Sequence, residues 1–85
     1  MTKFTDLYNE EEEYQKKLKV AREVVPKDIF DLGIDVLDDE RHFVNWLFSR
    51  LIALNRRRPI EIGVNDNDWE YIRSILYSID YGNLA

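Results

Sequence analysis

Two prolines, Pro26 and Pro59, divide this 85-residue chain into three segments, and they constrain its fold more than any other feature. Proline lacks a backbone N–H and disfavours helical geometry in the residue before it. Pro26 is therefore expected to stop one helix or to start a short turn, and Pro59 to end another helix. Because 85 residues form one domain at most, we expect a single helical domain over residues 1–85.

Apolar residues recur at helical spacing in three stretches, which predicts three helices. The expected bounds are about Thr5 to Val25, Asp39 to Arg57 and Asp66 to Tyr81. The expected capping residues are Asp38 for the second helix, and Asn65 or Asp66 with Gly82 for the third.

The two connections are predicted to be short and irregular. Lys27 to Leu32 has the length of a single helical turn, which Gly33 is expected to end. "PIEIGV", residues 59–64, alternates apolar with charged or small residues, which is typical of an extended segment. The predicted fold class is therefore all-α: a small three-helix bundle with a short extended segment between the second and third helices.

The helical projections also predict which side chains form the core. One narrow stripe of the first helix consists of Leu7, Tyr14, Leu18, Ala21 and Val25. The residues expected to be buried are Leu18, Leu47, Leu51, Ile72 and Leu76.

The chain lacks the residue patterns of several functional classes. It has no cysteine and one histidine, so neither a thiol nucleophile nor a histidine-pair metal site is expected. Its three glycines form no phosphate-binding or dinucleotide-binding motif. We therefore expect no enzyme activity, no cofactor and no metal. No apolar run is long enough for a signal peptide or a membrane span, which predicts a cytoplasmic protein without a membrane partner.

The charges lie in blocks along the chain. The net charge is −5, yet residues 41–58 hold five arginines and no acid. Residues 28–40 hold six acids and no arginine. Blocks of opposite sign pair either inside a bundle or across an interface, and the sequence leaves both open.

The three consecutive arginines, 56–58, have two interpretations. Cations near a helix C-terminus are stabilised by the helix dipole, by about 0.3–1 kcal/mol each. Alternatively, the helical projection of 39–57 places Trp46 among polar and basic side chains away from the apolar half. Arginine and tryptophan are enriched at the energetic centres of interfaces. The residues of this predicted partner-binding face are Trp46, Arg50 and Arg57, flanked by Arg56 and His42.

These observations predict a small non-enzymatic binding module that docks on another macromolecule. Its partner is expected to be a protein, and we also expect a homo-oligomer. An inhibitor, adaptor or assembly factor fits this description. Small viral, mobile-element and anti-defence proteins also share the small size, the acidic charge and the absence of catalytic residue patterns. The alternative is a binder of an anionic nucleotide or nucleic acid through the arginine cluster at the end of the second predicted helix. Acidic mimicry of a nucleic acid is disfavoured by the same arginines.

Overall fold

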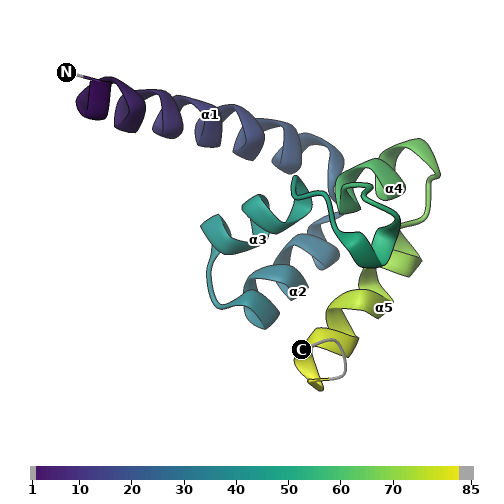
Figure 1. Cartoon of the computed structure of the whole chain (residues 1–85). Helices are drawn as coiled ribbons and strands as arrows, with labels where there is room; N and C mark the ends of the chain where they lie inside the picture. The colour runs from purple at the N-terminus through teal and green to yellow at the C-terminus, as the bar shows by residue number, and fades with distance from the viewer. Residues whose placement is uncertain (1, 83–85) are drawn as a thin grey trace.

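The computed structural model describes the backbone of residues 2–82 and the side chains of residues 10–82. Within these residues the chain forms five α-helices and one 3₁₀ turn and has no strand, so the all-α prediction is confirmed (Figure 1). The elements are α1 (Thr2–Val24), α2 (Lys27–Leu37), α3 (Glu40–Leu47), the 3₁₀ turn η1 (Ile52–Leu54), α4 (Pro59–Asn65) and α5 (Trp69–Asp80).

The predicted three-helix bundle is wrong, because both connections are helices. Gly33 does not end α2: a Cβ at this position would overlap the Phe43 ring, so the glycine lets α3 approach closely. The helix ends instead at Leu37 and is capped by Asp38, whose φ of 77° is left-handed. Contrary to the prediction, Pro59 does not end a helix but begins α4, because the first helical position needs no backbone N–H. "PIEIGV" is therefore helical and not extended.

The helix predicted over residues 39–57 is also much too long, since α3 ends at Leu47. Its N-cap is Asp39, whose carboxylate accepts a 2.7 Å hydrogen bond from the His42 backbone N–H. The predicted cap, Asp38, closes α2 instead. Beyond Leu47, the Arg58 side chain donates to the Phe48 carbonyl oxygen at 3.0 Å and takes the place of a further helical turn.

The first and last predicted helices agree well with the structure. α1 and α5 match them to within three residues at each end. The N-cap of α5 is Asp68, which accepts from the Tyr71 N–H, rather than Asn65 or Asp66. Gly82 has a φ of 80°, as expected of a glycine that follows a helix.

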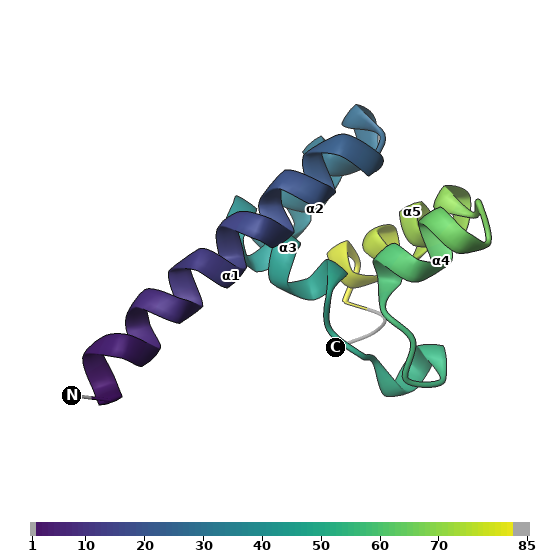
Figure 2. The ribbon, with the colours of Figure 1, turned by 90° about the horizontal axis from the view of Figure 1, so that it is seen from above.

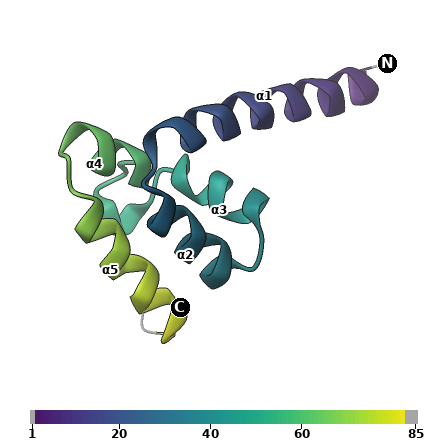
Figure 3. The same ribbon diagram turned by 180° about the vertical axis from the view of Figure 1, so that it is seen from behind.

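The helices pack in a continuous series. α2 packs between α3 and α5, α1 lies along α3, and α4 lies along α5. Figures 1, 2 and 3 all show the N-terminal half of α1 projecting away from the other helices. Three of the five predicted core residues, Leu47, Ile72 and Leu76, are completely buried, whereas Leu18 and Leu51 are half-buried.

The stripe predicted on α1 faces this core. Tyr14, Ala21 and Val25 are buried. The side chain of Leu7 lies outside the described residues.

Three ion pairs between helices involve residues of the charge blocks, but among residues 10–82 no arginine of the 41–58 block pairs with an acid of the 28–40 block. The three pairs are Arg22–Glu40 at 2.7 Å and Arg41–Glu11 at 3.1 Å, which link α1 to α3, and Arg73–Asp28 at 2.7 Å, which links α5 to α2. The blocks are thus used at least in part within one molecule.

The Gly33–Phe43 contact predicts an unusual response to mutation. Replacing a helical glycine with alanine ordinarily stabilises a helix by about 0.5–1 kcal/mol. Here the added methyl group overlaps the Phe43 ring, so Gly33→Ala should lower the free energy of unfolding by about 1–3 kcal/mol in urea titrations. The same change in a Phe43→Leu background should cost less. A stabilising Gly33→Ala in the wild-type background would contradict this contact.

Candidate functional site

The predicted partner-binding face does not exist as one side of a helix. His42 and Trp46 lie on α3, but the chain leaves the helix before Arg50, and Arg56 and Arg57 lie beyond η1. A helical projection of residues 42–57 therefore does not describe how these side chains are arranged. The five residues must be considered by their actual contacts.

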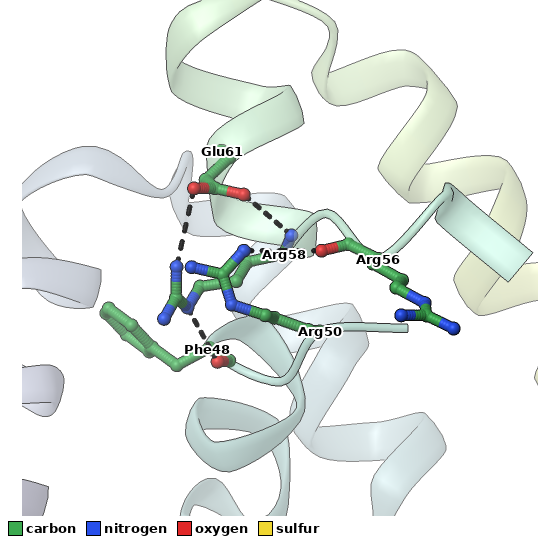
Figure 4. Close-up of polar contacts among 5 residues, drawn as sticks. All are labelled: Phe48, Arg50, Arg56, Arg58 and Glu61. Carbon is green, nitrogen blue, oxygen red and sulfur yellow. Dashed lines mark hydrogen bonds and ion pairs between the residues drawn. The ribbon is translucent and has the colours of Figure 1, made fainter. Parts of the chain in front are cut away.

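Two of the three consecutive arginines hold the fold together. Arg57 forms two hydrogen bonds with the Asp66 carboxylate, at 2.8 and 3.1 Å. Arg58 donates to the Phe48 carbonyl oxygen at 3.0 Å and approaches Glu61 at 3.4 Å (Figure 4). These contacts join the residues before α4 to its two ends. Because α3 ends at Leu47, neither arginine lies in the last turn of that helix, where the dipole interpretation placed it.

Glu61 completes the start of α4. Its carboxylate accepts the Arg58 backbone N–H at 2.8 Å, and this hydrogen bond is the main reason that the pKa of Glu61 is lowered. Burial acts in the opposite direction, and the charges of Arg58, Arg50 and Arg57 lower the pKa further.

Arg50 and Arg56 are the exposed members of the arginine cluster. Arg50 donates to the Arg56 carbonyl oxygen at 3.4 Å, and Figure 4 shows the Arg56 guanidinium pointing away from Glu61. Among residues 10–82, neither arginine forms an ion pair. His42 is exposed and lies 3.4 Å from the Asp39 carboxylate. Of the three arginines of the predicted face, Arg57 is thus used in an ion pair within the chain, whereas Arg50 and Arg56 are not.

The segment between Leu51 and Arg57, here called the η1 loop, is closed by its own backbone. The Leu51 N–H donates to the Arg57 carbonyl oxygen at 3.2 Å, and the Arg56 N–H donates to the Leu51 carbonyl oxygen at 2.8 Å. Asn55 and Arg56 turn the chain with φ values of 58° and 65°. Ile52 lies on this loop with 83% of its surface exposed, the largest value among the described large hydrophobic residues. The loop therefore holds an apolar side chain in water on a fixed backbone.

An apolar groove of about 450 Å³ lies beside Ile52, between the η1 loop and α5. Its lining contains no charged residue. The lining residues are Trp46, Leu51, Ile52, Ala53, Leu54, Tyr71, Ile75 and Ile79. A second hollow of about 340 Å³ shares Ala53, Leu54 and Tyr71 with it and ends at the Arg57–Asp66 pair. The two hollows form a continuous surface that is apolar at one end and polar at the other.

Trp46 belongs to both the core and the groove. It is half-buried, and its ring stacks on Phe43 with a centroid distance of 6.2 Å and an interplanar angle of 22°. Trp46 is thus partly a core residue, and its role in binding stays a prediction. Substitution of Trp46 changes stability and groove shape together and cannot separate them.

The outer side of α5 extends the uncharged surface. Ser74 and Ser78 follow Tyr71 by three and seven residues, so these residues share one side of the helix. Ser74 is exposed and Ser78 is half-buried. In a chain with 34% charged residues, such an uncharged surface is a distinctive feature.

The sequence analysis did not select Ile52 and Tyr71, which line the groove. Ile52 lies inside the helix predicted over residues 39–57, and nothing in the local pattern marks the end of α3 at Leu47. Tyr71 is 44% exposed, although it precedes the buried Ile72. The signal that would find Ile52 is its position in the apolar run of residues 51–54. The arginines that follow this run form the contacts that connect it to α4.

The remaining chemistry of the described residues is limited. Residues 10–82 contain no group of three or more side chains able to hold a metal ion. No described helix is long and apolar enough to cross a membrane. Comparison of the chain with known protein families, curated proteins and solved structures found no match.

The Arg57–Asp66 pair predicts a stability change in acid. Hydrogen bonds from Arg57 lower the pKa of Asp66 below its ordinary value of 3.8. The unfolded chain therefore binds a proton more readily, and the contribution of this pair is complete above pH 3.8 and lost as the pH falls through the folded-state pKa. NMR titration should show the Asp66 pKa rising toward 3.8 in Arg57→Ala. An unchanged Asp66 titration in this variant would contradict the pairing.

Proposed function

We propose that this protein is a non-enzymatic binding module that docks on another protein through the η1 loop and the adjacent apolar groove. The observation that carries the proposal is Ile52, which is 83% exposed on a hydrogen-bonded loop beside an uncharged groove. An inhibitor, an adaptor or an assembly factor acts in this way.

The exposure of Ile52 has an energetic meaning. Burying an isoleucine side chain contributes about 1.5–3 kcal/mol relative to leaving it in water. The folded monomer does not gain this contribution, although Leu54, two residues later, is buried. A partner that covers Ile52 gains it upon binding. Because the loop backbone is already ordered, little further conformational entropy is lost.

The composition of the groove favours a protein partner. The cores of protein interfaces are rich in tyrosine and tryptophan and poor in charge. The groove contains Trp46 and Tyr71 and no charged side chain. Arg56 lies in the η1 loop and Arg50 directly precedes it. This is the arrangement of an apolar centre with a polar rim.

Binding of an anionic nucleotide or nucleic acid has weaker support. Arg57 and Arg58 contact carboxylates of their own chain, which leaves Arg50 and Arg56 as the cluster's candidates for phosphate. Nucleic-acid binding also depends on positive charge over a surface, whereas this chain carries a net charge of −5.

A matched pair of substitutions tests the docking function. Ile52→Glu should abolish capture of the partner from a lysate of the source cells, because it places a carboxylate in the apolar contact. Val64→Glu is the control: Val64 is also apolar and 48% exposed, but it lies on α4 and outside the groove lining. Both variants should melt near the wild-type temperature.

The same capture experiment distinguishes the two partner classes. Nuclease treatment and moderate salt should leave capture by the wild-type protein largely intact, because an aromatic-centred contact is only weakly dependent on ionic strength. Capture that is lost with nuclease and with Arg50→Ala, but not with Ile52→Glu, would instead favour the nucleic-acid alternative.

A further inference from the structure

We infer that in the free protein the apolar groove is occupied by a second copy of this chain, in a two-fold symmetric dimer in which Ile52 of each copy inserts into the groove of the other. This inference rests on the proposed function, because it names an occupant of the same docking surface. A heterologous partner then binds by displacing the second copy.

The groove surface has the shape that a two-fold dimer requires. In such a dimer the same patch of both copies is in contact, so the patch must be complementary to itself. Here the projecting side chain, Ile52, and the hollow formed by Trp46, Ile75 and Ile79 lie side by side on one surface. Rotation about a two-fold axis between them places each Ile52 over the hollow of the partner.

The distribution of charge favours contact at this surface. Each copy has a net charge of −5, so two copies repel each other wherever carboxylates face carboxylates. The exposed residues Glu10 to Glu13 on α1 are an example of such a region. The groove lining, by contrast, contains no charged residue. Close approach of two copies is therefore least opposed there.

The rim adds charge complementarity between the copies. Arg50 and Arg56 belong to the loop side of the surface and form no ion pair among residues 10–82. Asp80 is exposed, directly follows the groove residue Ile79, and lies at the negative C-terminal end of α5. Insertion of the η1 loop into the partner's groove brings these arginines toward this acidic end.

Small domains gain most from such an association. A chain of this size buries a smaller fraction of its surface than a larger protein does and is marginally stable alone. Covering Ile52, Trp46 and Tyr71 in both copies adds apolar burial that the monomer lacks.

Sedimentation velocity over a range of concentrations tests the dimer. The wild-type protein should shift from monomer to dimer as concentration rises. Ile52→Glu should weaken dimerisation at least about 30-fold, which corresponds to loss of an interface hot spot. Val64→Glu adds the same charge outside the groove and should dimerise as the wild type does. A wild type that stays monomeric throughout, or an Ile52→Glu protein that still dimerises normally, overturns the inference.

Cross-linking tests the reciprocal insertion, since the natural chain contains no cysteine. A tagged Ile52→Cys copy mixed with an untagged Ile79→Cys copy should give a tagged–untagged product with a short bismaleimide reagent. A mixture of Val64→Cys with Ile79→Cys should not. Circular dichroism confirms that each variant is folded. Equal yields in the two mixtures would overturn the proposed geometry.

Failure of the dimer and failure of the docking function give different results. Partner capture that depends on Ile52, by a protein that remains monomeric, overturns the dimer and leaves the docking function standing. An Ile52-dependent dimer without any Ile52-dependent capture supports the dimer and contradicts docking on a different protein.

Discussion

The insertion of Phe43 against Gly33 is the contact on which the rest of this structure depends. Phe43 is completely buried, and its ring occupies the space that a Cβ at position 33 would need. It meets Phe30 edge-on at 5.3 Å and stacks with Trp46 at 6.2 Å. The contact therefore sets the distance between α2 and α3 and also positions one wall of the groove. The packing of Phe43 in the core therefore also helps to determine the shape of the groove, because Trp46 stacks on Phe43 and lines that groove.

A second constraint determines why the chain leaves α3 so early. Arg58 donates to the Phe48 carbonyl oxygen, and its own backbone N–H donates to Glu61. The first interaction spans ten residues of sequence and the second is local to the start of α4, so together they join the end of α3 to the start of α4. The intervening residues must then form a compact loop whose closing contacts are backbone hydrogen bonds. Ile52 is exposed as a consequence of this closure, because the short loop cannot turn every apolar side chain inward.

The sequence predicted the parts of the fold that depend on local periodicity and failed where a distant contact decides. α1 and α5 follow from their apolar spacing alone. The apolar pattern Phe43, Leu47, Leu51 and Leu54 continues at helical spacing past the end of α3, so periodicity could not reveal the break. Gly33 was interpreted as a helix end because its contact with Phe43 is ten residues away in sequence. The cap at the start of α4 is local, since Glu61 is three residues after Arg58, and it was missed because the alternating pattern of residues 59–64 favoured an extended segment. The role of Trp46 and the arginines in binding stays a prediction, but the single helix face on which they were placed is wrong, because α3 ends at Leu47.

The position of Trp46 has a consequence for how binding and folding are related. Its ring touches the central Phe43 on one side and lines the groove on the other. Anything that fills the groove of the native state and does not bind the unfolded chain stabilises the fold by mass action. Because Trp46 links the groove to the Phe43 contact, an occupant also restricts the packing of α3 on α2. In the proposed docking function, occupancy of the groove and stability of the core are therefore coupled through the stacked rings of Trp46 and Phe43, and also through Leu54 and Ile75, which are buried in the core and line the same groove.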